Sequence, residues 1–160
     1  MADLTHIDSD GNAQMVDVGQ KTDSQRRALA EGYLIGSADT LDQIMADALP
    51  KKEAITTARL AGIMGAKKTA DLIPLCHPLG LDQVTVTIER STDTSLKVLA
   101  EATITAKTGV EMEALTAVSV SLLTLYDMAK AIDKCLTLTN IRLLEKDGGK
   151  SGSWRADKGD

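Results

Sequence analysis

Apolar and polar residues alternate along four stretches of the chain. Between residues 83 and 89, valine and isoleucine alternate with threonine and glutamate, and residues 96–104 show the same period of two. Since successive side chains of a strand point to opposite faces, this period predicts β-strands. The predicted strands cover residues 26–36, 83–89, 96–104 and 136–144. The polar residues 90–95 predict a hairpin between the second and third strands.

Three other stretches carry apolar residues at intervals of three and four, which is the spacing of one helix face. The longest runs from residue 110 to 134, and its apolar face consists of Val110, Leu115, Val118, Leu122, Leu125, Met128 and Ala129. A second predicted helix runs from about residue 53 to 70. A short one covers residues 39–48 and ends before Pro50, because proline cannot continue a helix.

The order strand, helix, strand, strand, helix, strand is that of the ferredoxin-like βαββαβ fold. We therefore predict an α+β protein, in which two helices back one face of an antiparallel sheet. A short helix and an additional N-terminal strand would lie outside this repeat. We expect the other face of the sheet to be apolar and to be covered by a second subunit.

Length and composition suit a single domain spanning residues 1–160, since 43% of the 160 residues are hydrophobic. We expect residues 1–14 and 146–160 to be mobile, because the second range is polar and rich in glycine.

The charge and aromatic content argue against several classes of protein. With a net charge of −5 and only three aromatic residues, Tyr33, Tyr126 and Trp154, the chain is not expected to bind nucleic acid. No apolar run reaches the ~18 residues that span a bilayer, and no basic leader opens the chain. Cys76 and Cys135 form no disulfide framework. We expect a cytoplasmic protein that binds no membrane.

Charged residues interrupt the long helix at both ends. Glu111 and Glu113 lie in its first turn, and Asp127 and Lys130 lie three residues apart near its end. Glu111 could form a capping box with Thr108, and the second pair could be an exposed ion pair. If that pair instead lies in a cleft, desolvation would lower the lysine pKa and make the lysine a general acid or base.

Cys76 and His77 lie between Pro74 and Pro78 in a mostly apolar segment. They could be buried structural residues or part of a site. Because there is no second Cys-His pair, we expect no zinc site and no other metal site. Adjacent residues of an extended segment point to opposite sides, which also disfavours a cysteine nucleophile activated by His77.

Several basic residues could be solvated surface charges or could bind a polyanion. They are Arg26, Arg27, Lys51, Lys52, Lys67 and Lys68. The segment Gly148-Gly-Lys-Ser-Gly152 is not a Walker loop, because Leu144 occupies the position of the first required glycine. It could still fold over phosphates through its backbone N–H groups and Lys150.

Taken together, these motifs closely resemble one family over almost the whole chain: cyclic pyranopterin monophosphate synthase, the molybdenum cofactor biosynthesis protein C. The resemblance is carried by Leu4-Thr-His-Ile7, Met15-Val-Asp-Val18, Thr57-Ala-Arg-Leu-Ala-Gly-Ile63, Asp71-Leu-Ile-Pro-Leu-Cys-His-Pro-Leu79, Lys107-Thr-Gly-Val-Glu-Met-Glu-Ala-Leu-Thr116, Leu125-Tyr-Asp-Met128 with Lys130, and Gly148-Gly-Lys-Ser-Gly152.

The resemblance implies a ferredoxin-like subunit in a homohexamer built as a trimer of dimers, with active sites between subunits. It also implies a reaction, in which (8S)-3′,8-cyclo-7,8-dihydroguanosine 5′-triphosphate is converted to cyclic pyranopterin monophosphate and diphosphate. The enzyme would be a lyase that needs no cofactor.

By similarity, Asp127 and Lys130 match the catalytic pair of the family, and Lys51 matches a second catalytic lysine. The substrate-binding segments match Leu75, Cys76 and His77, and also Met112 and Glu113 with Glu111 beside them. Arg26, Lys67 and Lys150 are weaker candidates for contacts with the triphosphate. In many family members glycine follows the first lysine. Here Lys52 takes its place, so either lysine could face the site, and we favour Lys51.

Two other functions remain open from the sequence. One is a regulatory oligomer that binds a nucleotide without converting it, because one fold supports many functions. The other is acyl or thiol chemistry at Cys76.

Overall fold

A single antiparallel sheet forms the centre of the fold. The computed structural model describes residues 10–157. The strands are β1 (Ser24–Ile35), β2 (Gln83–Thr92), β3 (Ser95–Ala106), β4 (Thr137–Asp147) and β5 (Trp154–Arg155). They pair in the order β2-β3-β1-β4-β5, and every neighbouring pair is antiparallel. The first four strands have the order of a ferredoxin-like sheet, so the predicted α+β fold is confirmed.

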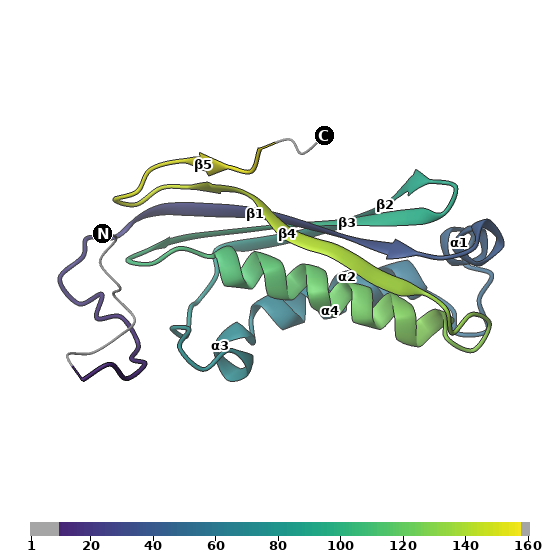
Figure 1. The fold of residues 1–160 in the computed structure, drawn as a ribbon, viewed down its shortest axis with the longest axis horizontal. Coiled ribbons are helices and arrows are strands. Elements are labelled where there is room, and N and C mark those ends of the chain that lie inside the picture. The colour runs from purple at the N-terminus through teal and green to yellow at the C-terminus, as the bar shows by residue number, and fades with distance from the viewer. Residues whose placement is uncertain (1–9, 158–160) are drawn as a thin grey trace.

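The helices are α1 (Ala38–Met45), α2 (Ala54–Ala66), α3 (Thr69–Leu72) and α4 (Glu111–Ala129). Figure 1 shows α2 and α4 on the same face of the sheet. Along the long axis of the molecule, the N-terminal segment of residues 10–23 and α3 lie toward one end and α1 lies at the other (Figure 1). Because α4 runs along this axis, its first and last turns lie toward opposite ends of the molecule.

Several expected boundaries differ from the structure. The helix predicted over residues 53–70 is divided into α2 and α3, and the buried Thr69 hydroxyl donates a hydrogen bond to the carbonyl of Ala66 at the break. Val110 is the N-cap of α4 and no side chain caps that end, so the predicted capping box is wrong. Residues 10–23 contain no further strand of the sheet, and residues 1–9 lie outside the described part of the chain.

The C-terminal region contains more strand than the pattern predicted. β4 continues to Asp147, because the carboxylates of Glu145 and Asp147 bind Arg27 of β1 at 2.8 and 3.2 Å. β5 then pairs with β4 within the range expected to be mobile. The mobility of residues 1–14 and 146–160 stays a prediction.

Small residues of β1 let α4 lie close to the sheet. A Cβ atom at Gly32 would lie 2.7 Å from a methyl group of Val118 and 2.8 Å from one of Leu122. Both side chains are fully buried on α4. The apolar stripe predicted along this helix is therefore its core face, which fixes the direction of the charged residues at its two ends.

The face of the sheet opposite the helices carries charges. Glu31 is only 3% exposed and binds Lys97 of β3 at 3.1 Å and Arg142 of β4 at 2.9 Å. Burial alone would raise the pKa of Glu31, but the hydrogen bonds from Arg142 and Lys97 outweigh it and lower the pKa. The expectation of an apolar face is wrong, because these ion pairs satisfy polar side chains that the alternating pattern placed there.

The helices also expose apolar side chains. Leu60 and Met64 of α2 are 57% and 67% exposed, and Leu123 of α4 is 60% exposed. Leu60 and Met64 lie four residues apart on one face of α2, and contiguous apolar surface is typical of contacts between proteins.

Candidate active site

Asp127 lies between two lysines at the C-terminal end of α4. One carboxylate oxygen is 2.6 Å from Lys130 Nζ, and the other is 2.9 Å from Lys51 Nζ. Lys51 also donates to the backbone carbonyl of Asp127 at 3.0 Å. The structure therefore places in contact three residues that the resemblance named, with Lys51 contributed by the loop before α2. Their catalytic roles stay a prediction.

The two lysines keep Asp127 ionised. Hydrogen bonds from Lys130 and then Lys51 lower the pKa of Asp127 to about 2, and Asp127 in turn raises the pKa of Lys130. All three side chains are about half exposed in the single chain. The burial that would lower the pKa of Lys130 is thus not present here. Asp127 raises that pKa and makes Lys130 a weaker acid, so the single chain presents Lys130 as a cation that can stabilise negative charge.

Lys51 and Lys52 point to different partners. Lys52 Nζ donates to the backbone carbonyl of Asp47 at 2.8 Å, whereas Lys51 reaches Asp127. Of the two adjacent lysines, Lys51 is therefore the one beside the acid.

A second group of predicted residues surrounds a pocket of about 360 Å³ near the first turn of α4. The predicted members of its lining are Leu75, Cys76, His77, Glu111, Met112 and Glu113. The His77 ring nitrogen Nε2 is 2.9 Å from the carbonyl oxygen of Val16, which also lines the pocket. This contact connects the N-terminal segment to the segment between the two prolines.

Glu113 is the buried acid of this pocket. It is 4% exposed, and desolvation is the main reason that its pKa rises to about 7, with the charge of Glu111 adding to the effect. Desolvation and the nearby Glu113 also raise the pKa of Cys76. The Cys76 thiol therefore stays protonated at neutral pH, which argues against its acting as a nucleophile.

The buried Glu113 should make stability depend on pH. Between about pH 4.5 and pH 7 the folded protein binds a proton that the unfolded chain has lost, so the free energy of unfolding falls as pH rises. We expect Glu113→Gln to remove about 3 kcal/mol of this fall. Denaturant unfolding at both ends of this range, at one protein concentration, measures it. Glu89→Gln is the control, because Glu89 is exposed, and it should leave the decrease in unfolding free energy unchanged. If the unfolding free energies of wild type and Glu113→Gln fell equally with pH, Glu113 would not be the group that takes up the proton.

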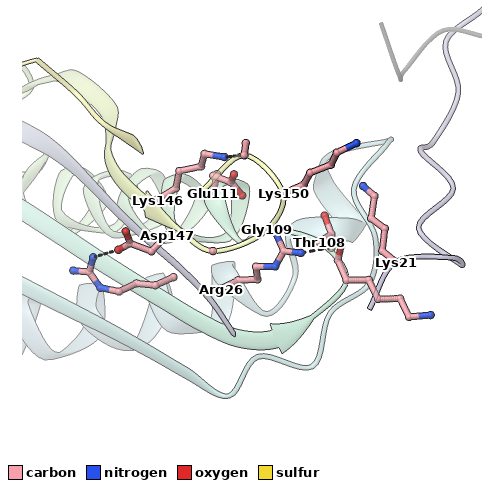
Figure 2. A pocket seen from close by; sticks show the side chains of 12 residues that line it. Lys21, Arg26, Thr108, Gly109, Glu111, Lys146, Asp147 and Lys150 are labelled. Carbon is pink, nitrogen blue, oxygen red and sulfur yellow. Dashed lines mark hydrogen bonds and ion pairs between the residues drawn. The ribbon is translucent and has the colours of Figure 1, made fainter. Parts of the chain in front are cut away.

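A neighbouring pocket of about 340 Å³ is rich in cations. Figure 2 shows that Arg26 of β1, Lys146 of β4, Lys150 and Lys21 come to it from separate segments. Glu111 belongs to the lining of both pockets. The two pockets are thus adjacent, one cationic and one containing His77 and the buried acid.

The C-terminal loop packs directly on Arg26. A Cβ atom at Gly149, whose φ is +78°, would lie 1.7 Å from a guanidinium nitrogen of Arg26. Arg26 also donates from Nη2 to the carbonyl of Lys107 at 3.4 Å. Its Nε is buried and has no hydrogen-bond partner among the described residues. A side chain at position 149 would be strained by the positive φ and would push the Arg26 guanidinium aside, so glycine lets this loop lie over it.

Three lysines of the cationic pocket were not predicted from the sequence: Lys21, Lys107 and Lys146. Each stands in a polar stretch where a solvated lysine is the ordinary outcome. Lys107 opens one of the segments that carry the resemblance, but its neighbours in the sequence do not mark it as a pocket residue. Lys67 lies elsewhere, in a smaller pocket of about 190 Å³ that Glu113 also lines. The structure thus separates Lys67 from Arg26 and Lys150.

The two groups of predicted residues lie at opposite ends of α4. Asp127 lies fourteen positions after Glu113, which corresponds to about 21 Å along a helix axis. One chain therefore does not bring the Asp127 cluster and the His77 pocket into one cleft.

Within residues 10–157, no three His, Cys, Asp or Glu side chains are placed to hold a metal ion. Among the helices of the same residues, none is long and apolar enough to cross a membrane.

Comparison with known proteins assigns the chain to a family. The sequence model of the MoaC family matches residues 15–149. The chain belongs to the MoaC family. Apart from Lys150, every predicted site residue lies inside the matched range, as do both ends of α4.

Relatives of similar length are closely similar. The cyclic pyranopterin monophosphate synthase of Novosphingobium aromaticivorans is 57% identical over 156 residues, which cover 98% of this chain and 99% of the relative. That of Brucella ovis is 55% identical, covering 94% of this chain and 92% of the relative. Cyclic pyranopterin monophosphate synthase 3 of Mycobacterium bovis is 53% identical, covering 98% and 89%. The likeness to these relatives thus covers more than nine tenths of the chain.

Proposed function

We propose that the protein is a cyclic pyranopterin monophosphate synthase of molybdenum cofactor biosynthesis, acting in the cytoplasm. Its substrate would be (8S)-3′,8-cyclo-7,8-dihydroguanosine 5′-triphosphate, and it would act as a lyase that releases diphosphate. Membership of the MoaC family and the names of relatives more than 50% identical support this proposal. The reaction is a rearrangement and would need no redox cofactor.

The observation that carries the proposal is the chemistry of the two ends of α4. One end presents a carboxylate held by two ammonium groups, and the other presents a cationic pocket beside a pocket with a buried acid. The triphosphate suits the cationic pocket that contains Arg26 and Lys150. The base-derived part, with its N–H donors, suits the pocket of Leu75, Cys76, His77, Met112 and Glu113.

Asp127, Lys130 and Lys51 would carry the proton transfers. Opening one ring and closing another require protons to be delivered to and removed from heteroatoms of the substrate. When a ribose hydroxyl attacks the α-phosphate, negative charge develops as diphosphate leaves, and a protonated lysine stabilises it. Asp127 keeps both lysines directed at one place and keeps Lys130 charged.

We further propose that the complete site forms between subunits of a homohexamer, a trimer of dimers. The separation of the two clusters within one chain supports this, because an acid group about 21 Å from the pockets cannot act on a molecule bound there. The exposed Leu60, Met64 and Leu123 offer apolar surface for such contacts.

Incubating the purified oligomer with the cyclised dihydroguanosine triphosphate tests the proposal. We expect stoichiometric release of diphosphate and appearance of the pterin product. The alternative, a regulatory oligomer, would bind the same molecule and return it unchanged. The arrangement of Asp127 between two lysines favours the enzyme, since binding an anion gains nothing from a carboxylate beside the cations.

A further inference from the structure

Asp47, near the start of the loop that carries Lys51, is hydrogen-bonded to the last two residues of that loop. The loop connects α1 to α2 and covers residues 46–53. The Asp47 carboxylate accepts a hydrogen bond from the backbone N–H of Glu53 at 2.5 Å. Its backbone carbonyl accepts a hydrogen bond from Lys52 Nζ at 2.8 Å. Asp47 therefore contacts the residues that follow Lys51 through both its side chain and its backbone.

The backbone at the two ends of this loop is unusual. Asp47 and Glu53 have φ of +55° and +62°, a conformation that disfavours residues with a Cβ atom. Aspartate tolerates it better than most residues, whereas glutamate has no such advantage. The conformation of Glu53 therefore needs support from a neighbour, and the Asp47 carboxylate binds its N–H.

The same contact begins α2. Glu53 is the N-cap of this helix, and its own side chain makes no capping hydrogen bond. In a capping box, an acid three residues into the helix binds the N–H of the N-cap residue. Asp47 supplies that carboxylate from outside the helix, so the start of α2 and the loop are fixed together.

We propose that Asp47 is a positioning residue for Lys51. By closing the loop, Asp47 holds the backbone of Lys51 where its ammonium reaches both the carbonyl and the carboxylate of Asp127. By binding Lys52, it also keeps the adjacent ammonium away from that acid. Its effect on turnover rests on the proposed synthase function, whereas its effect on the Lys51 contact does not.

Crystal structures of the intact oligomer with Asp47→Ala and with Asp47→Asn test the contact itself. The asparagine oxygen can still accept from the Glu53 N–H, so Asp47→Asn should keep Lys51 Nζ at 2.9 Å from the Asp127 carboxylate. In Asp47→Ala, Lys51 should no longer lie within hydrogen-bond distance of Asp127. Asp39→Ala is the matched control, because Asp39 is an exposed acid of α1 whose carboxylate accepts a hydrogen bond from Gln43 and from no other side chain of residues 10–157. An unchanged Lys51–Asp127 bond in Asp47→Ala would overturn the proposal.

Kinetics of the same variants test the consequence for turnover. We expect Asp47→Ala to lower kcat about tenfold to a hundredfold with little change in KM, because a displaced group no longer meets the reacting atoms. Asp47→Asn and Asp39→Ala should keep wild-type kcat. In a Lys51→Ala background, Asp47→Ala should cause no further loss. Losses that multiply in the double variant would overturn the proposal. If the wild-type oligomer shows no turnover, the proposed function fails, and the crystal structures still decide the role of Asp47.

Discussion

Replacing Lys130 by alanine is expected to reduce product formation by about 10²- to 10⁴-fold, the range of a lost general acid or base. The reason is geometric: Lys130 Nζ lies 2.6 Å from the Asp127 carboxylate, which keeps the amine protonated and directs it. Asp127→Ala should have an effect of similar size, because it releases both lysines at once. Diphosphate release under saturating substrate measures both.

Lys134→Ala is the matched control for Lys130→Ala. Lys134 is an exposed lysine a few residues after α4, and among the described residues its ammonium takes part in no ion pair with Asp127. Its removal changes the net charge equally and should leave kcat within about twofold. Size-exclusion chromatography should show the same oligomer for all variants, because the Asp127 cluster is half exposed and outside the core. Near-normal turnover by Lys130→Ala and Asp127→Ala would mean that the acid-base assignment is wrong.

The core of the fold could be predicted from local patterns. Residues 96–104 alternate because one side of β3 packs under the helices, where Val98, Ala100 and Ala102 are almost completely buried. Likewise, the three- and four-residue spacing along α4 describes the stripe that contains Val118 and Leu122. Both patterns arise because one side of a strand or helix is buried against the rest of the protein, and apolar residues then recur in the sequence at the period of that element.

Other features depend on contacts between distant segments. β4 extends to Asp147 because Arg27, 120 positions earlier, binds two of its acids. The break between α2 and α3 depends on how Thr69 is buried against the body of the protein. No local spacing records these contacts. Nor does it record that Lys97 and Arg142, on the two strands beside β1, pair with Glu31.

For the candidate site, residue identities were easier to predict than their arrangement. The resemblance named Asp127, Lys130 and Lys51, and the structure placed them in contact. The choice of Lys51 over Lys52 follows from the turn at Asp47, which the sequence does not reveal. Lys21, Lys107 and Lys146 join the cationic pocket only because the sheet and the N-terminal segment bring them together.

The separation of the two clusters along α4 predicts that variants inactive by themselves regain activity when they assemble together. If each active site takes the Asp127 cluster from one subunit and the His77 pocket from another, two inactive variants can complement each other. Lys130→Ala removes the ammonium group beside Asp127 at the last turn of α4, and His77→Ala removes the imidazole from the pocket at its first turn. In a mixed dimer of these two chains, one site carries both changes and the other carries neither.

Activity of co-assembled variants is therefore the most direct test of the account. Lys130→Ala and His77→Ala oligomers should each be nearly inactive. After the two are unfolded together in equal amounts and refolded, random pairing should restore about a quarter of wild-type turnover. Refolding each variant alone controls for the treatment and should restore none. A mixture that assembles normally yet stays as inactive as its parents would contradict a site shared between subunits.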